Sequence, residues 1–293
     1  GKTIYIYELL GEGQPGNSTY AATMADSYHK FGNALRQKGS HDEAVEQCTK
    51  SIEIYEFLVN SHPKRPLYRL SMADAVSGLA HALRENEKLE EAIEQYENVI
   101  TLAENLVKNY PGEILYTNSL AVSYYQFSYV LADLNKYEEA IEQYGKTIEI
   151  YELLVEGQPG NSEYARWLAD SYHNLGYALR QNGSHDEAIE QYAKAMMLYG
   201  KLVEEHPSVS EYAYVLSESI TNVGIMAGKN GDYGRAVKLG EALALLAVPD
   251  GAARALNLYN AACLLSLASA AAAKDEELAE ADRTALVDKN TAP

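Results

Sequence analysis

The sequence predicts an all-α protein, a right-handed superhelical solenoid of antiparallel helix pairs. Three observations lead to this prediction: one pattern recurs every 48 residues without insertions, each copy carries two amphipathic helical stripes, and glycine or proline separates the stripes. A single pair would leave its apolar stripe exposed. Stability therefore has to come from stacking neighbouring pairs around a continuous core.

Two columns of residues mark the period independently. Each proline closes a helical segment because it has no N–H and a fixed φ. In addition, residues 6–47 repeat residues 150–191 with about three-quarters of the positions identical, which indicates duplication of a block of three repeats. The columns are Tyr20, Tyr68, Tyr116, Tyr164 and Tyr212, and Pro15, Pro63, Pro111, Pro159 and Pro207.

Each repeat is predicted to contain two helices, called here the A helix and the B helix. In the fourth repeat Gly183 ends the A helix. The run from Ser184 to Glu187 has the pattern of a capping box, in which serine and glutamate side chains bind free N–H groups of the B helix. The predicted inner stripes are Tyr164, Leu168, Tyr172, Leu175 and Leu179 on the A helix, and Ala188, Tyr192, Ala195 and Tyr199 on the B helix.

The period also predicts how the chain is organised. The first residues match the middle of a repeat, so we expect a lone B helix there and a natural N-terminus upstream. The apolar stripe of that helix, Ile4, Tyr7 and Leu10, has no A helix to cover it. The predicted segments are a partial repeat at 1–19, repeats at 20–67, 68–115, 116–163 and 164–211, a fifth repeat at 212–250 with a short B helix, and a divergent capping helix pair at 251–293.

Composition narrows the classes of function. The 293 residues are 47% hydrophobic, which excludes a disordered chain, and the net charge of −18 disfavours nucleic acid and anionic membranes as partners. The longest apolar stretch, about 15 residues, is too short to cross a bilayer. Two cysteines cannot form a disulfide framework, which favours a reducing, cytoplasmic setting. The sequence has 24 tyrosines and only 3 phenylalanines, so the core must lie near enough to the surface for the tyrosine hydroxyls to reach water or a hydrogen-bond partner.

The repeats resemble the tetratricopeptide repeat family, whose pattern is an aromatic, Leu-Gly, a hydrophobe, Gly, Ala, an aromatic and Ala in fixed order. The fourth repeat matches it throughout, whereas the third and fifth depart from it, with Ser128 and Gly240 at two of the positions. The matching residues are Tyr172, Leu175, Gly176, Leu179, Gly183, Ala188, Tyr192 and Ala195.

A standard unit of that family has about 34 residues, so this one is longer by about 14, or four helical turns. We therefore expect both helices to be extended. Units of 48 residues are similar to arrays attached to planctomycete-type serine/threonine protein kinases, and residues 258–263 resemble the segment that ends those arrays.

The resemblance implies a concave groove lined by four positions of each A helix. It carries over to His29, Asn33, Arg36, Gln37, Ser77, His81, Arg84, Tyr125, Tyr129, Asp133, His173, Tyr177, Arg180 and Gln181. Arg36, Arg84 and Arg180 form a column of cations that could bind a carboxylate or phosphate. Alternatively, they pair with Asp26, Asp74 and Asp170 on the same face, or with neighbouring repeats.

Other motifs favour structural readings over chemistry. The string from Gly11 to Gly16 fits G-x-G-x-x-G, but no strand precedes it, so an inter-helix turn is expected. The histidines lack the spacing of a metal site, and Cys48 occupies a core position held by tyrosine in other repeats. Protein kinase motifs are absent from the sequence. We therefore expect no catalysis, no metal and no cofactor.

These observations predict a non-catalytic protein-protein interaction scaffold whose A-helix groove binds a peptide or a partner protein. The alternative is a regulatory or self-association segment of a larger multidomain protein, such as a serine/threonine kinase. Self-association would use the exposed N-terminal helix.

Overall fold

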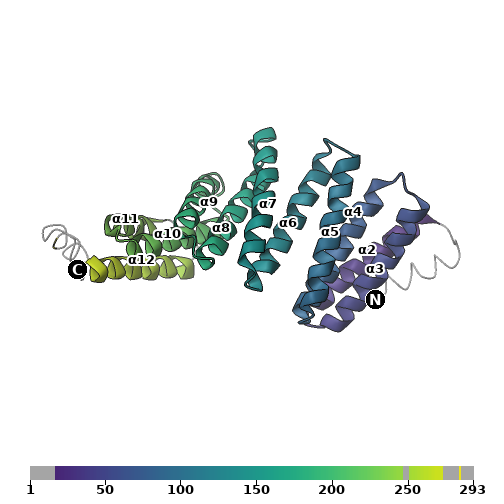
Figure 1. The fold of residues 1–293 in the computed structure, drawn as a ribbon, viewed down its shortest axis with the longest axis horizontal. Helices are drawn as coiled ribbons and strands as arrows, with labels where there is room; N and C mark the ends of the chain where they lie inside the picture. The colour runs from purple at the N-terminus through teal and green to yellow at the C-terminus, as the bar shows by residue number, and fades with distance from the viewer. Residues whose placement is uncertain (1–16, 247–250, 273–283, 285–293) are drawn as a thin grey trace. The chain divides into compact units, whose positions relative to one another are not determined.

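The computed structural model describes residues 17–246, 251–272 and 284, and all regular secondary structure within these residues is helical (Figure 1). The chain divides into two compact units, residues 1–134 and 135–293. The predicted lone helix at the N-terminus, the glycine string from Gly11 to Gly16 and the last helix of the predicted capping pair lie outside the described residues. No helix of the described part is both long and apolar enough to cross a membrane.

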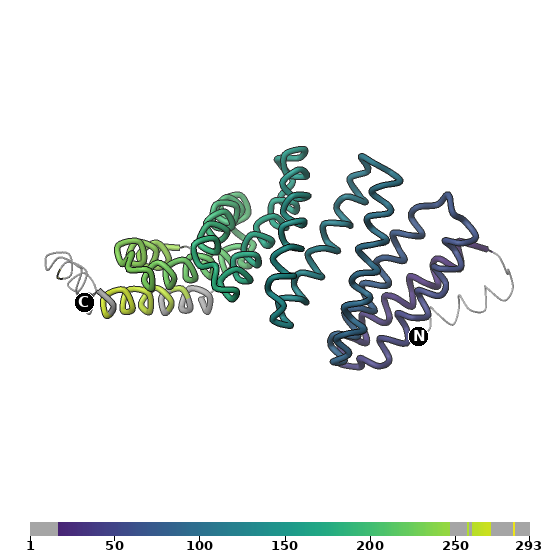
Figure 2. The backbone as a smooth tube through the Cα atoms, viewed as in Figure 1, coloured from purple at the N-terminus to yellow at the C-terminus, as the bar shows by residue number. Residues whose placement is uncertain are grey.

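The first unit consists of two layers of helices. The A helices α2, α4 and α6 contact one another in order, and each B helix packs between the A helices that precede and follow it. Figure 2 traces the alternating course of the backbone through these pairs. The helices are α2 (Ser18–Gln37), α3 (His41–Ser61), α4 (Pro66–Glu85), α5 (Leu89–Asn109) and α6 (Ile114–Asp133).

The second unit continues the alternation with α8 and α10 as A helices. The shortened B helix expected in the fifth repeat is present as α11. The predicted capping helix after residue 250 is α12, which packs on both α10 and α11. The helices are α7 (Tyr137–Gly157), α8 (Ser162–Gln181), α9 (His185–Glu205), α10 (Ser210–Lys229), α11 (Tyr233–Leu245) and α12 (Gly251–Ala272).

A left-handed residue separates each A helix from its B helix. Gly39, Gly183 and Gly231 have φ near +80°, a conformation that glycine adopts without steric cost. Glu87 and Asn135 adopt φ near +60° at the same position of the second and third repeats. The turn is therefore kept by the repeat geometry even where glycine is missing.

The capping box predicted at Ser184 is wrong in one respect. Ser184 is the N-cap of α9, but its side chain makes no capping hydrogen bond, and Ser40 behaves in the same way in α3. The reason is that the Ser184 N–H donates to the carbonyl oxygen of Leu179 at 2.9 Å. The end of α8 thus fixes the backbone of this residue at ψ 66°, away from the extended conformation typical of a capping serine.

The predicted inner stripe of the B helix is confirmed. Ala188, Tyr192, Ala195 and Tyr199 are almost completely buried, as are the tyrosines at equivalent positions of the other B helices. Gly176 of α8 makes room for this stripe, because a Cβ atom there would lie 3.0 Å from the ring of Tyr192. Close approach of the two helices therefore depends on a glycine on one side and a flat ring on the other.

Several core tyrosines donate a hydrogen bond from the hydroxyl to a carboxylate. Tyr55 donates to Asp26, and Tyr199 donates to Asp170 in the equivalent contact of the second unit. A second repeating contact joins the hydroxyl of Tyr124 to Glu104 at 2.5 Å, and the hydroxyl of Tyr172 to Glu152. The acidic side chains thus supply the acceptors that the tyrosine-rich core needs.

Candidate functional site

The A helices of the first unit line an open polar cavity of about 400 Å³. Most of its lining comes from two turns of α2 and two turns of α4. Six of the residues expected to line the groove take part: His29, Asn33, Arg36, Gln37, Ser77 and His81. Asp74, Gly78 and Gln126 complete the lining.

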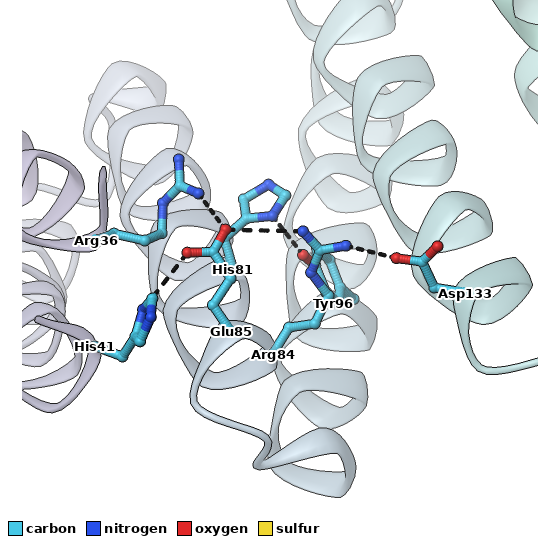
Figure 3. A network of polar contacts seen from close by, with 7 residues as sticks. All are labelled: Arg36, His41, His81, Arg84, Glu85, Tyr96 and Asp133. Carbon is cyan, nitrogen blue, oxygen red and sulfur yellow. Dashed lines mark hydrogen bonds and ion pairs between the residues drawn. The ribbon is translucent and has the colours of Figure 1, made fainter. Parts of the chain in front are cut away.

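Two residues of the cavity lining, Arg36 and His81, belong to a network of polar contacts that contains an ion-pair ladder (Figure 3). Nη1 of Arg36 donates to Oε1 of Glu85 at 2.5 Å, and Nη1 of Arg84 donates to Oδ2 of Asp133 at 2.9 Å. His41 adds Nδ1 at 3.6 Å from the other oxygen of Glu85. In both pairs the acid lies 49 residues after the arginine, one repeat plus one position. We call this arrangement the arginine ladder.

The arginine ladder decides between the alternatives that the sequence left open for the first unit. Arg36 and Arg84 pair with the neighbouring repeat, not with Asp26 or Asp74 on their own helices. The carboxylate of Asp26 instead accepts from Tyr55. These arginines therefore already have carboxylate partners, which lowers their capacity to hold an external anion.

His81 lies deep between the two arginines. Its Nδ1 is 2.8 Å from the hydroxyl of Tyr96, and the two rings meet edge to face. Burial lowers the pKa of His81 to about 4, with Arg36 and Arg84 acting in the same direction. The imidazole is therefore neutral at physiological pH, and its contact with Tyr96 fixes the ring.

Other candidates in the first unit hold one another in place. His29 and Asn33 share a hydrogen bond of 2.9 Å, and Ser77 donates to Gln126 at 2.6 Å. Gly78 lets the imidazole of His29 lie close to α4, because a Cβ there would be 2.9 Å from Nε2. The cavity wall is therefore a set of oriented polar groups on rigid helices.

Aromatic candidates lie further along the same unit. Tyr129 is 45% exposed, with the Arg84 guanidinium 5.7 Å from the centre of its ring. Tyr125 is half-buried, and Asp133 is exposed. Tyr129 offers a flat surface to a ligand, whereas the carboxylate of Asp133 is engaged by Arg84.

Candidates in the second unit fall into two kinds. His173 is only 9% exposed, and its Nδ1 lies 2.8 Å from the Ser219 hydroxyl, so its ring is part of the packing between α8 and α10. Tyr177 and Gln181 are exposed, and the Arg180 guanidinium lies 5.5 Å from the Tyr177 ring centre. Tyr177 and Arg180 thus form a paired surface feature on α8.

Sequence reasoning missed Gln126 and did not place Asp74 in the cavity. Both could have been found from the ladder spacing and the helix face: Gln126 follows Ser77 by 49 residues, and Asp74 precedes Ser77 by three. Burial, reinforced by the charge of Asp26, raises the pKa of Asp74 to about 6. The cavity lining therefore includes a carboxyl group that takes up a proton at about pH 6.

Cys48 and the histidines are the side chains that the sequence raised as candidates for chemistry. Burial raises the pKa of Cys48 to about 11, which leaves its thiol protonated and unreactive at neutral pH. No group of three or more His, Cys, Asp or Glu side chains in the described ranges is arranged to hold a metal ion.

Models of the tetratricopeptide repeat match residues 25–57, 73–106, 120–158 and 168–208. These four segments together make up about half of the chain. The helix pairs and the lined cavity define a helical repeat protein, and the matches specify which kind. The chain belongs to the tetratricopeptide repeat family.

Solved structures support the fold. The crystal structure of BtubC (BKLC) from P. vanneervenii aligns with 85% of this chain and 89% of its own, at 16% identity and a TM-score of 0.57. The nearly identical TPR-like repeats of a Podosopora anserina kinesin light chain candidate align with 88% of this chain and 99% of their own, at 21% identity and a TM-score of 0.54.

A third structure is the STAND protein with a tetratricopeptide repeat sensor from Pyrococcus horikoshii. It aligns with 97% of this chain but only 38% of its own, at 12% identity and a TM-score of 0.63. No curated protein sequence matches this chain significantly. At these identities the likeness shows the fold alone.

Proposed function

We propose that this protein is a non-catalytic interaction scaffold that binds a peptide or a segment of a partner protein on its A helices. The observation that carries the proposal is the cavity of about 400 Å³ in the first unit, because the groove positions implied by the repeat pattern line most of it. Its donors and acceptors are fixed by neighbours, which reduces the entropy lost on binding.

Each unit also exposes an aromatic side chain on one of its A helices. Tyr129 and Tyr177 are large and rigid, and each has a guanidinium close to its ring. Rigid rings of this kind supply contact area at a low cost in conformational entropy. In the first unit the partner is therefore expected to place polar main-chain groups in the cavity and a side chain against Tyr129.

Affinity capture from the native lysate tests the proposal. We expect alanine at Arg36, Arg84, Arg180, Tyr129 and Tyr177 to reduce recovery of the captured partner, with unchanged helicity by circular dichroism. The matched controls are Phe57→Ala and Met197→Ala, which remove exposed side chains of the B helices α3 and α9. If recovery depends on Phe57 or Met197 and not on the A-helix residues, the partner binds to the B helices and the proposed site is wrong.

A further inference from the structure

The A helices of the first unit border a second hollow, at the end where α4 and α6 begin. Its volume is about 660 Å³. It is lined by residues 64–68, around the start of α4, and by Tyr110, Glu113, Leu115 and Tyr116, around the start of α6. We call this hollow the edge cavity. No residue lines both the edge cavity and the polar cavity of about 400 Å³, so the two are separate features of one unit.

Two leucines of the edge cavity are exposed to solvent. Leu67 is 58% exposed and Leu115 is 52% exposed, and they occupy the same position of adjacent repeats. The matching residues of the other repeats are polar: Thr19, Glu163 and Glu211. Exposed apolar side chains at a cavity are typical of a contact with a partner.

The turn before α4 is also basic. Lys64, Arg65 and Arg69 fall within six residues of the sequence, and the first two are exposed and line the edge cavity. The equivalent positions of the other four repeat turns hold no lysine or arginine. Acids exceed bases by 18 in the whole chain, so this turn differs in charge from its surroundings. An acidic ligand is attracted here although the molecule as a whole repels it.

Neighbouring groups orient the two arginines. Nη1 of Arg65 donates to the hydroxyl of Tyr68 at 3.1 Å, and the guanidinium lies 5.8 Å from the centre of that ring. Nη1 of Arg69 donates to the carbonyl oxygen of Pro63 at 3.2 Å. A guanidinium has five N–H groups, so each arginine keeps donors beyond these contacts. An acidic side chain would therefore meet donors that are already oriented.

One acid opposes this positive charge. Glu113 is exposed and lines the edge cavity from the side of α6. Its charge weakens the attraction of an acidic ligand, but Lys64 and Arg65 outnumber it in the lining. The effect of removing Glu113 therefore reports the sign of the charge on the ligand.

The hollows of the first unit follow one another along the A helices. A cavity of about 200 Å³ between α4 and α6 shares Leu115 with the edge cavity, and it shares Ser77 and Gln126 with the polar cavity. Ser77 lies ten residues after Leu67 on α4, or about 15 Å along the helix axis. An extended chain of about five residues covers that distance. The row of hollows therefore fits an elongated segment better than a flat lipid surface.

We propose that the edge cavity binds a short segment of the partner protein in which an acidic side chain lies next to an apolar one. Lys64 and Arg65 bind the acidic group through charge-assisted hydrogen bonds, and the apolar side chain lies against Leu67 and Leu115. This proposal rests on the proposed function and adds the chemistry of one part of the ligand of the first unit.

Defined peptide pools test the proposal on the full chain. The probes are fluorescent heptapeptides, N-acetylated and C-terminally amidated, with uncharged random flanks around a central tripeptide. The first pool has two glutamates beside a leucine, in both orders. The second replaces the glutamates by glutamine, and the third replaces the leucine by serine. Fluorescence anisotropy at constant, low ionic strength measures binding, and we expect the first pool to bind about fivefold or more tightly than either of the others.

Two variants locate the contacts. The double variant Lys64→Gln with Arg65→Gln should abolish the preference for glutamate over glutamine. Leu67→Ser should abolish the preference for leucine over serine. These side chains are exposed, so neither variant should change the helicity measured by circular dichroism.

Matched controls make the same chemical changes elsewhere. Lys38→Gln with Lys88→Gln alters the net charge equally, at exposed positions in the turns that follow α2 and α4. Leu153→Ser removes a leucine that is 67% exposed on α7. Both controls should keep both preferences.

Glu113→Gln gives a prediction of the opposite sign. Because it removes the acid of the edge cavity, it should tighten binding of the first pool by about twofold. Weaker binding of that pool by Glu113→Gln would contradict an acidic ligand and overturn the proposal.

Each other result with the pools has a defined meaning. If the pools bind without the two preferences, or if the preferences survive in the edge-cavity variants, the edge site is overturned and the proposed function stands. If no pool binds, both the edge site and peptide binding by the first unit fall.

Two other occupants of the edge cavity are tested directly. Cosedimentation with phosphatidylserine vesicles that is lost in the Lys64→Gln, Arg65→Gln variant would assign the cavity to a lipid surface. A dimer by light scattering that is lost in Leu67→Ser would assign it to a second copy of the chain. We expect neither result, and either one overturns the proposal.

Discussion

At the scale of single residues, tyrosine and carboxylate side chains depend on each other. Tyr55 with Asp26, and Tyr199 with Asp170, link a B helix to the A helix of the same repeat. A buried phenol needs an acceptor, and a partly buried carboxylate needs donors, so one contact satisfies both groups. Part of the excess of tyrosine in the sequence is thus explained by part of its excess of acidic residues, because the two side chains form hydrogen-bonded pairs.

Removing one hydroxyl should show this dependence. We expect Tyr199→Phe to lower the free energy of unfolding by about 1–3 kcal/mol, because Asp170 loses a donor while it remains partly buried. The pKa of Asp170, which burial already raises, should rise further, since the Tyr199 hydroxyl favours the charged carboxylate. Urea unfolding and a carbon-13 titration of the carboxyl group measure the two effects.

Tyr214→Phe is the matched control, because Tyr214 is 49% exposed. Tyr214→Phe also removes a tyrosine hydroxyl, but from the surface of α10, so it should change the free energy of unfolding by less than about 0.5 kcal/mol. Equal losses in the two variants would show that the contact with Asp170 adds nothing to stability.

At the scale of helices, contact between the A and B helices of one repeat requires a small residue. In the first repeat Gly32 faces the sulfur of Cys48, and in the fourth Gly176 faces the ring of Tyr192. Each glycine is buried inside a helix, where it costs about 1 kcal/mol relative to alanine. The close packing it permits offsets that cost.

The glycine requirement gives a prediction with an internal control. Gly176→Ala should destabilise the protein by about 1–3 kcal/mol, because its Cβ would press on a ring that cannot move. Gly200→Ala, in α9, meets nothing within 4 Å and should stabilise by up to about 1 kcal/mol through helix propensity. The midpoints of urea unfolding compare the two, and a Gly176→Ala variant as stable as Gly200→Ala would contradict the packing argument.

At the scale of the whole molecule, the half-buried His81 of the first unit and the buried His173 of the second link stability to pH. Burial lowers the pKa of His81 in the first unit and of His173 in the second to about 4. Below about pH 6.5 the unfolded chain binds protons that the folded chain rejects. The contribution of these groups to stability is therefore full above pH 6.5 and is lost as the pH falls towards 4.

Replacing one histidine should flatten this dependence. Between pH 7 and 5 we expect His173→Gln to lose about 2 kcal/mol less stability than the parent protein. Three titratable or charged groups face this imidazole: Tyr192 from α9, Glu218 from α10 and Arg180 from its own helix. Glu218 acts in the opposite direction, because its raised pKa lets the folded chain take up a proton.

His185→Gln is the control for this experiment, since His185 is exposed at the start of α9. Urea unfolding at several pH values measures all three proteins. If the parent and His173→Gln lose stability in parallel between pH 7 and 5, the buried imidazole is not the source of the acid sensitivity.

The amino-acid sequence determined the helical architecture of this protein. The 48-residue period, the inner stripes and the glycine and proline positions predicted the helix pairs, and the shortened α11 and the capping α12 were predicted as well. These features are local, because the periodicity of a helix and the positions at which it begins and ends are encoded within about 20 neighbouring residues.

Only the tertiary structure decided how the polar side chains are partnered. The arginine ladder joins Arg36 to Glu85 across a repeat boundary. The carboxylate of Asp26, which the sequence analysis considered as a partner of an arginine, accepts a hydrogen bond from the Tyr55 hydroxyl. Several acids lie within reach of each arginine along the sequence. Small offsets between stacked helices determine which acid each arginine contacts. A hydrogen bond is sensitive to changes of a few tenths of an ångström in the donor–acceptor distance, and the spacing of residues along the sequence does not specify that distance.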